Sequence, residues 1–217
     1  MPEAETSRCR LCLVTPLQSE PAALAKLVGA ALSGGDVASL IIAVDPADPV
    51  VLQRLAEAIV PIAAARGVAT LIHNDTRIVG RTGADGVHVD SGAADLTGAV
   101  GGLRPKKKIV GAGGIRSRHE AMGAGEADPD YVFFGRLDGD TGEAIFAKAL
   151  ELAAWWSSLF VIPAIVMGGS AIASVRQAAE ARIEFVALSR AVFAAADPAA
   201  AVAEANRILA GAPELVP

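Results

Sequence analysis

Short apolar runs rich in Val, Ile and Leu alternate with longer amphipathic segments rich in Ala along the whole sequence. Runs of the first kind are typical of buried strands, and segments of the second kind are typical of surface helices. Asp48, Asp75, Ser170 and the pair Asp197-Pro198 precede helical segments and are suited to helix starts. We expect strands over residues 10–15, 37–44, 68–73, 86–89, 108–111, 131–134, 164–167 and 185–188. We expect helices over residues 20–32, 49–66, 76–81, 93–103, 117–125, 141–159, 170–182 and 198–210.

Strands that alternate with helices predict a parallel sheet, because parallel neighbours need a crossover connection. Continuously apolar runs such as residues 40–44 are expected where helices cover a sheet from outside. Eight such units in about 200 residues indicate an α/β fold, a compact (β/α)8 TIM barrel with eight parallel strands. A doubly wound sheet is the alternative, but no glycine-rich fingerprint follows the first strand. We expect a single domain over residues 1–217, with its core at about residues 10–210.

The composition is apolar, but its pattern is not that of a membrane protein. Hydrophobic residues make up 53% of the 217 residues and aromatic residues only 4%, so Ala, Val, Leu and Ile must build the core. Residues 152–175 carry no charge and are long enough to span a bilayer, but Pro163 and a glycine pair interrupt them. The acidic start of the chain does not resemble a signal peptide. We expect no membrane partner and a cytoplasmic location.

The net charge of −5 and the isoelectric point of about 5.2 give no electrostatic basis for binding nucleic acid. Cys9 and Cys12 form an isolated C-x-x-C pair on an expected strand, where this spacing places side chains on opposite faces. We interpret them as two small, semi-buried side chains in a reducing compartment, not as a redox pair or a zinc site.

In a (β/α)8 barrel the active site lies at the carboxyl ends of the strands, so the residues there are the functional candidates. The end of the seventh strand carries Gly168 and Gly169, which allow close approach of the backbone, and then Ser170 at an expected helix start. Ser189 and Arg190 follow the eighth strand. Loops after the last two strands are the recurrent phosphate site of this fold, so we expect these residues to bind phosphate.

Asp75 and Asp90 follow neighbouring strands and supply hard oxygen ligands suited to Mg²⁺. Capping of the following helix is an equally good interpretation of Asp75. His88, inside a short strand, is a candidate polar contact or proton carrier at the barrel mouth. His73 is similar to His88, whereas His119 falls on a charged helix and is expected to be solvated.

At these residues the sequence resembles the thiamine phosphate synthase family and its thiazole tautomerase relatives, which are (β/α)8 barrels. Residues 84–88, Ala-Asp-Gly-Val-His, carry the most specific likeness. Residues 13–15 resemble the opening strand of the family, Asn74-Asp75 its Asn-Asp-Arg motif, residues 168–169 its Gly-Gly and residues 185–189 its last strand. The resemblance covers nearly the whole chain in order.

The resemblance implies that hydroxymethylpyrimidine diphosphate is joined to thiazole phosphate, with release of pyrophosphate and formation of thiamine phosphate. It implies that Asn74 and Asp75 contact pyrophosphate and Mg²⁺, and that His88 lies near the pyrimidine. Gly168, Gly169 and Ser189 would hold the thiazole phosphate. The catalytic residues are then Asp75, His88 and Arg136. Its partners are small phosphorylated molecules, and a homo-oligomer is compatible with the sequence.

Several motifs of the family are altered. Its strand 2 motif Gln-Leu-Arg-x-Lys is replaced by residues 39–44, Ser-Leu-Ile-Ile-Ala-Val. The strand 5 motif Gly-x-Ser-x-His reads Gly-Ala-Gly-Gly-Ile over residues 111–115, and the strand 6 motif Thr-x-Thr-Lys is absent from residues 136–141. After the strand 4 histidine the family has Gly-Gln-x-Asp, whereas residues 90–93 read Asp-Ser-Gly-Ala. The second carboxylate that would bind the metal is therefore Asp90 or Asp95, or is missing. The candidates to replace the lost cations are Arg77, Arg116, Arg118 and Arg136.

Two alternatives remain beside the synthase. One is a regulatory paralogue that binds a phosphate ligand without turnover, which the altered motifs favour. The other is a different phosphate-sugar barrel enzyme, for which Asp75 and Asp138 would form the acid–base pair.

Overall fold

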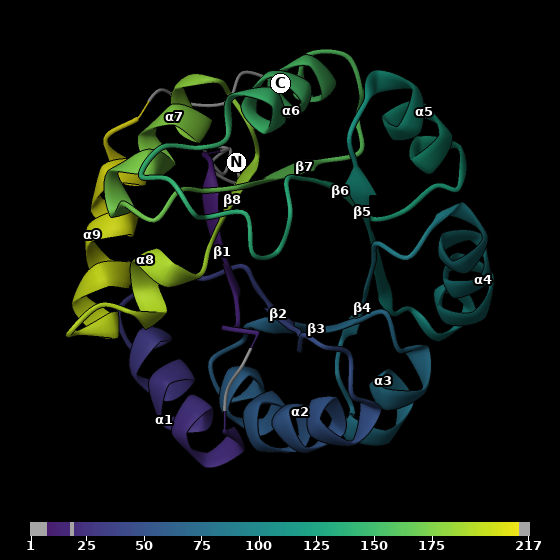
Figure 1. Ribbon diagram of the computed structural model, residues 1–217, viewed down its shortest axis with the longest axis horizontal. Coiled ribbons are helices and arrows are strands. Elements are labelled where there is room, and N and C mark those ends of the chain that lie inside the picture. Colours follow the sequence, from purple (N-terminus) through teal and green to yellow (C-terminus); the bar gives the residue numbers. More distant parts are fainter. Residues whose placement is uncertain (1–7, 18–19, 213–217) are drawn as a thin grey trace, which may run out of the picture.

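The computed structural model describes residues 8–17 and 20–212, and its strands close into a parallel barrel in sequence order (Figure 1). Each strand pairs with the next, and β1 closes the barrel against β8, with Leu13 opposite Leu188. The predicted (β/α)8 fold is confirmed. The strands are β1 (Arg10–Val14), β2 (Ser39–Ile42), β3 (Ala69–His73), β4 (Gly86–Val89), β5 (Ile109–Ile115), β6 (Tyr131–Phe134), β7 (Ala164–Met167) and β8 (Phe185–Leu188).

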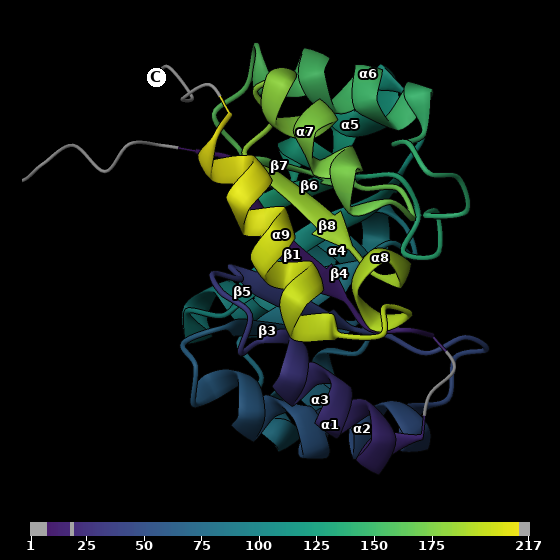
Figure 2. The ribbon, with the colours of Figure 1, turned by 90° about the vertical axis from the view of Figure 1, so that its left-hand side faces the viewer.

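Helices surround the strands as an outer ring, which Figure 1 shows from one end of the barrel and Figure 2 from the side. None of the helices in the described part of the chain is long and apolar enough to cross a membrane. They are α1 (Pro21–Ala31), α2 (Pro49–Ala64), α3 (Thr76–Thr82), α4 (Ala93–Leu103), α5 (Arg118–Glu126), α6 (Ala147–Ser157), α7 (Val175–Glu180), α8 (Arg190–Phe193) and α9 (Pro198–Ala210), with short 3₁₀ turns at Arg104–Lys106 and Ile172–Ser174.

Alternate residues of each strand point to opposite faces of the sheet, so the buried apolar side chains form two separate clusters. The larger cluster lies between strands and helices, and the smaller one fills the barrel interior with side chains such as Leu71, Phe133 and Met167. Cys9 belongs to the outer cluster and Cys12 to the inner one, as their spacing predicts. Both are buried free thiols. Burial raises the pKa of each, to about 11 for Cys12, which keeps them protonated and unreactive.

Carboxylate caps begin several helices as predicted. Asp48, Asp75 and Asp197 each accept backbone N–H groups of the first turn that follows. Ser170 was expected to cap the helix after β7, but this is wrong, since the 3₁₀ turn begins at Ile172 with Ala171 at its cap. The predicted helix over residues 170–182 is therefore shorter and is divided into a 3₁₀ turn and α7.

Further corrections concern the segments that follow β5, β6 and β8. Strand β5 runs on to Ile115 through an irregularity at Gly113 and Gly114, where Gly114 has a φ of +71° that favours glycine. The helix predicted to begin at residue 141 begins instead at Ala147, because residues 137–145 form a connection of turns and bends. A single helical turn, α8, follows β8 and was not predicted.

Candidate functional site

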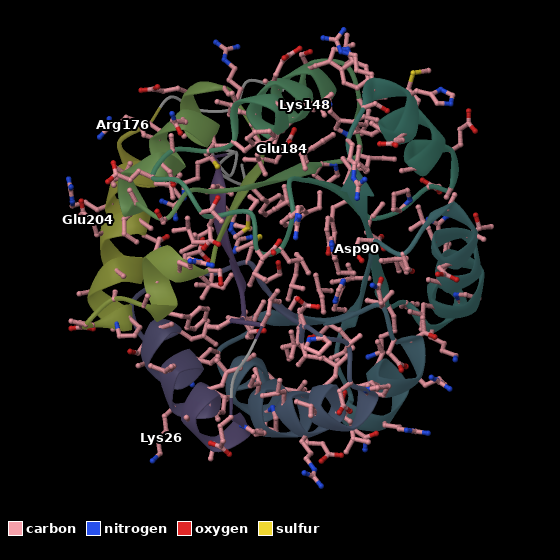
Figure 3. The ribbon with its side chains drawn as sticks, viewed as in Figure 1. Lys26, Asp90, Lys148, Arg176, Glu184 and Glu204 are labelled. Carbon is pink, nitrogen blue, oxygen red and sulfur yellow. The ribbon has the colours of Figure 1, made fainter. Side chains whose placement is uncertain are left out.

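A cavity of about 920 Å³ opens at the carboxyl ends of the strands, where the fold predicts an active site. Its apolar walls come from residues such as Leu137, Phe146 and Met167. Figure 3 shows Asp90 inside the ring of helices and Lys148 on α6. The polar and charged residues that line the cavity are Asp45, His73, Asp90, Arg116, Arg136, Asp138, Thr141 and Lys148.

Asp90 is held in place by the end of β3. His73 Nε2 donates to Asp90 Oδ1 at 2.9 Å, and Asn74 Nδ2 donates to the same oxygen at 2.7 Å. The Asp90 N–H in turn donates to Asn74 Oδ1 at 2.9 Å. Asn74 adopts a φ of +56°, a conformation that Asn tolerates better than most residues. The ends of β3 and β4 are therefore joined through Oδ1 of Asp90, a residue that lines the cavity, and its Oδ2 takes no part in these hydrogen bonds.

The Asp90 carboxylate remains charged in this setting. Burial acts to raise its pKa, but the hydrogen bond and charge of His73, with the Asn74 hydrogen bond, hold the pKa well below its usual range. A fixed, ionised carboxylate at a cavity wall can bind a cation or orient a substrate amino group.

His88 lies deeper, inside the barrel, and is only 1% exposed. A hydrogen bond of 2.9 Å joins its Nδ1 to the Tyr131 hydroxyl, and its ring lies edge-on to Phe133. Burial, with the nearby charge of His73, lowers the pKa of His88 to about 3, so the ring is neutral. Gly113 packs on its other side, where a Cβ atom would lie 2.5 Å from His88 Nε2. His88 does not line the cavity itself, and its ring centre lies 6.1 Å from that of His73, which does.

Asp75 caps α3. Its Oδ1 accepts the N–H groups of Arg77 and Ile78, and its Oδ2 lies 3.3 Å from the Arg77 guanidinium. Burial acts to raise the pKa of Asp75, but the hydrogen bonds from Arg77 and Ile78 lower it below its usual value. Asp75 is not among the residues that line the cavity, so the structure brings Asp90 to the cavity but not Asp75.

The described residues contain no group of three or more His, Cys, Asp or Glu side chains placed to hold a metal ion. Mg²⁺ is commonly held by one or two carboxylates together with substrate phosphates and water. Asp90, which lines the cavity and whose Oδ2 takes no part in the hydrogen bonds from His73 and Asn74, fits this weaker mode of binding. Asp95 lies exposed in the first turn of α4, away from the cavity lining.

The end of β7 does not offer the free amides that the sequence suggested. Gly168 N–H donates to Ala187 O at 2.8 Å, and Gly169 N–H donates to Ser174 Oγ at 3.0 Å. Ser170 N–H donates to Gly142 O at 2.8 Å. These amides already have partners within the chain, so an anion could bind here only if those partners moved away.

The end of β8 is likewise occupied. Ser189 is buried, and Arg190 N–H donates to Asp140 Oδ2 at 2.6 Å. Arg190 Nε lies 3.5 Å from Asp140 Oδ1. Asp140, whose side chain is 2% exposed, was not singled out from the sequence, because it lies within the predicted loop between β6 and its helix.

The cations that line the cavity come from the residue that follows β5, the loop after β6 and the start of α6. Arg116 and Arg136 line the cavity as candidates from the sequence, and Lys148 joins them. Lys148 was missed because the helix after β6 was expected to begin at residue 141. That start places Lys148 in the middle of a helix, whereas in the structure it lies in the first turn of α6. Arg77 pairs with Asp75, and Arg118 lies over the Trp155 ring, so neither reaches the cavity. His119 is exposed on α5, as expected.

Comparison with known proteins decides the family. A sequence model described as "Thiamine monophosphate synthase" matches residues 11–192. The chain belongs to this family. It is 35% identical over 208 residues to a thiamine-phosphate synthase of Rhodospirillum centenum, with 94% of this chain and 99% of that protein covered. It is also 35% identical over 208 residues to the corresponding protein of Hyphomonas neptunium, covering 93% and 94% of the two chains.

The fold comparison agrees with this membership of the thiamine monophosphate synthase family. The thiamine phosphate pyrophosphorylase of Pyrococcus furiosus superposes with a TM-score of 0.77 at 19% identity, over 94% of this chain and 97% of that one. A 3-hexulose-6-phosphate synthase superposes with a TM-score of 0.73 at 21% identity, covering 92% and 99%. At such identities the two structures show the barrel fold alone.

Proposed function

We propose that this member of the thiamine monophosphate synthase family joins hydroxymethylpyrimidine diphosphate to thiazole phosphate, giving thiamine phosphate and pyrophosphate. Membership of the family supports the reaction class. The observation that carries the proposal for this chain is the cavity itself, in which the fixed Asp90 carboxylate shares the wall with Arg116, Arg136 and Lys148. A diphosphate leaving group needs cations close to its oxygens, and these side chains supply them.

Arg116, Arg136 and Lys148 take the place of the cations missing from β2. Arg136 forms two hydrogen bonds of 2.8 Å with Asp138, but both side chains are solvent-accessible, so this pair is weak and can open for a phosphate. Departure of the diphosphate leaves a positive charge on the pyrimidine-methyl carbon, so neutralisation of the leaving group and alignment of the thiazole nitrogen supply most of the catalysis.

His73, Asn74 and Asp90 orient the pyrimidine side of the cavity in this proposal. The Asn74 and His73 hydrogen bonds hold Asp90 with one oxygen toward the ligand. His88, which the sequence likeness places near the pyrimidine, is buried behind His73, and we assign it to positioning the wall of the cavity.

Asp90 is the carboxylate that we propose for Mg²⁺, with substrate oxygens completing the coordination. Asp75 does not line the cavity in this structure, so joining Asp90 would require its Oδ2 to exchange the 3.3 Å hydrogen bond from the Arg77 guanidinium for the metal, while Oδ1 continues to cap α3. When bound, Mg²⁺ would neutralise the leaving diphosphate. Gly168, Gly169, Ser170, Ser189 and Arg190 remain the proposed site for the thiazole phosphate, once their present partners are displaced.

The experiment compares binding of pyrophosphate to native protein, Arg116→Ala and Arg118→Ala by calorimetry with Mg²⁺ present. We expect Arg116→Ala to weaken binding about tenfold, since one charge-assisted contact is lost. Arg118→Ala removes a cation two residues away that does not line the cavity and is the matched control. Equal affinities for all three proteins would contradict the assigned role of Arg116.

The closed ends of β7 and β8 favour one alternative, a paralogue that binds a phosphate ligand without turnover. For such a protein, pyrophosphate would raise the melting temperature although no thiamine phosphate forms from the two substrates. Product formation by the native protein excludes it.

A further inference from the structure

Residues 137–145, between β6 and α6, run across the ends of β7 and β8, where Figure 1 shows a loop passing from β6 toward α7 and α8. We call this segment the strap. Leu137 is buried in the cluster of the barrel interior at one end of it. At the other end Ile145 is buried in the outer cluster, and its N–H donates to Gln177 Oε1 at 2.9 Å. The strap is therefore fixed at both ends.

Asp140 is the charged residue at the centre of the strap. It is 1% exposed, and its carboxylate contacts both the N–H and the guanidinium of Arg190. A buried carboxylate is stable only with such partners. Helix α8 is one turn long (Arg190–Phe193), so the attraction comes from Arg190 and not from a helix dipole.

Backbone carbonyl oxygens of the strap likewise accept hydrogen bonds from N–H groups of the segment that follows β7. Gly142 O accepts from Ser170 N–H at 2.8 Å, and Glu143 O accepts from Ala171 N–H at 3.3 Å. The contact is tight, because a Cβ atom on Gly169 would lie 2.1 Å from Glu143 O. Residues 140–143 thus present three oxygen-bearing groups to donors from two neighbouring strand ends, as the oxygens of one bound phosphate group would.

We propose that Asp140 is a specificity-determining residue, whose carboxylate competes with the phosphate of a substrate for Arg190, while the carbonyl oxygens of Gly142 and Glu143 beside it occupy the amides after β7. The inference rests on the proposed function, which assigns the thiazole phosphate to this place. A phosphate and the Asp140 carboxylate are both anions and cannot share one set of donors. A phosphate ester therefore binds here only when residues 140–143 move away. The strap then loses its contacts with Arg190 and the amides after β7, and the free energy of those contacts is subtracted from the binding of the phosphate ester.

The test titrates inorganic phosphate into ¹⁵N-labelled native protein, Asp140→Asn and Glu143→Gln, followed by amide resonances. Asn still accepts from Arg190 N–H but no longer neutralises the guanidinium. We expect Asp140→Asn to bind phosphate about tenfold more tightly than native protein, with shifts at Ser170, Ala171 and Arg190. Glu143→Gln removes the same charge from an exposed side chain of the strap, keeps its carbonyl, and should bind like the native protein.

The inference is wrong if folded Asp140→Asn binds phosphate no more tightly than native protein, or if only amides around Arg116 shift. If the Asp140→Asn variant does not fold, Asp140→Ser, which keeps a hydroxyl acceptor, is used in its place.

Limited proteolysis of native protein after Glu143 is an independent test of whether residues 140–143 move when phosphate binds. Saturating phosphate should speed cleavage there, and unchanged cleavage would contradict movement of the strap. Tighter phosphate binding in a protein that makes no thiamine phosphate would keep this inference and reject the proposed function.

Discussion

His88 shows how a single side chain depends on the barrel around it. Its ring stacks on Tyr131 with centroids 5.9 Å apart, and the two share a hydrogen bond. Burial raises the pKa of Tyr131 well above its usual value, so the hydroxyl keeps its proton for that bond. Because the charge of Asp90 compensates only in part for burial and for the nearby charge of His73, a protonated His88 is costly in the folded protein.

This cost predicts a pH dependence of stability. The pKa of His88 is about 3 in the folded protein, against its ordinary value of 6.5, so between these pH values the unfolded chain binds one proton more than the folded protein. The stabilisation is complete above about pH 6.5 and is lost as the pH falls, by up to about 1.4 kcal/mol per pH unit. Urea unfolding at pH 7.5 and pH 5 measures this loss. His88→Gln should reduce the slope, whereas His119→Gln, at an exposed position, should not; an unchanged slope in His88→Gln would refute the argument.

Asp90 carries a negative charge at the cavity wall, fixed there by His73 and Asn74. Asp90→Asn keeps the size and the capacity to accept from His73 but removes the charge, so we expect kcat/KM to fall about a hundredfold while the fold is kept. Steady-state kinetics on the two substrates measures it. Asp95→Asn removes an equal charge from the exposed face of α4 and should leave kcat/KM unchanged. Equal activities of both variants would show that Asp90 is not part of the site.

At the scale of elements, Asp75 caps α3 and is also a proposed contact for Mg²⁺ or diphosphate, and two variants distinguish these roles. Asn caps a helix as well as Asp, so Asp75→Asn should leave the free energy of unfolding nearly unchanged, whereas Asp75→Ala should lower it by about 1 kcal/mol. If Asp75 also contacts Mg²⁺ or diphosphate, both variants lose coupling activity. Chemical unfolding and kinetics on the same samples distinguish these effects. Full activity of Asp75→Asn would show that Asp75 serves only as the cap of α3.

Periodicity located the strands well, because apolar side chains buried on both faces give an unambiguous signal. The bounds of β4, β6, β7 and β8 agree with prediction, and β5 was underestimated because glycines carry no hydrophobic signal. Residues 141–145 of the strap were predicted as helix because their conformation depends on contacts with Ser170, Ala171 and Gln177, which lie far along the chain. No local pattern contains that information.

At the scale of the whole molecule, closure of the barrel brings together residues from separate units. The sequence placed Asp90, Arg116 and Arg136 at strand ends, and the structure puts all three around one cavity with Lys148. The sequence could not show that Asp140 would occupy the end of β8, because that contact joins residues 50 positions apart. The covered phosphate site is thus a property of the assembled barrel.

The most direct measurement is formation of thiamine phosphate by the purified protein from hydroxymethylpyrimidine diphosphate and thiazole phosphate with Mg²⁺. The account predicts product that needs both substrates, that is lost when EDTA removes the metal, and that falls about a hundredfold in Asp90→Asn. An enzyme of known activity in the same assay controls for the substrates. Absence of product from folded native protein, beside an active control enzyme, would contradict the proposed synthase.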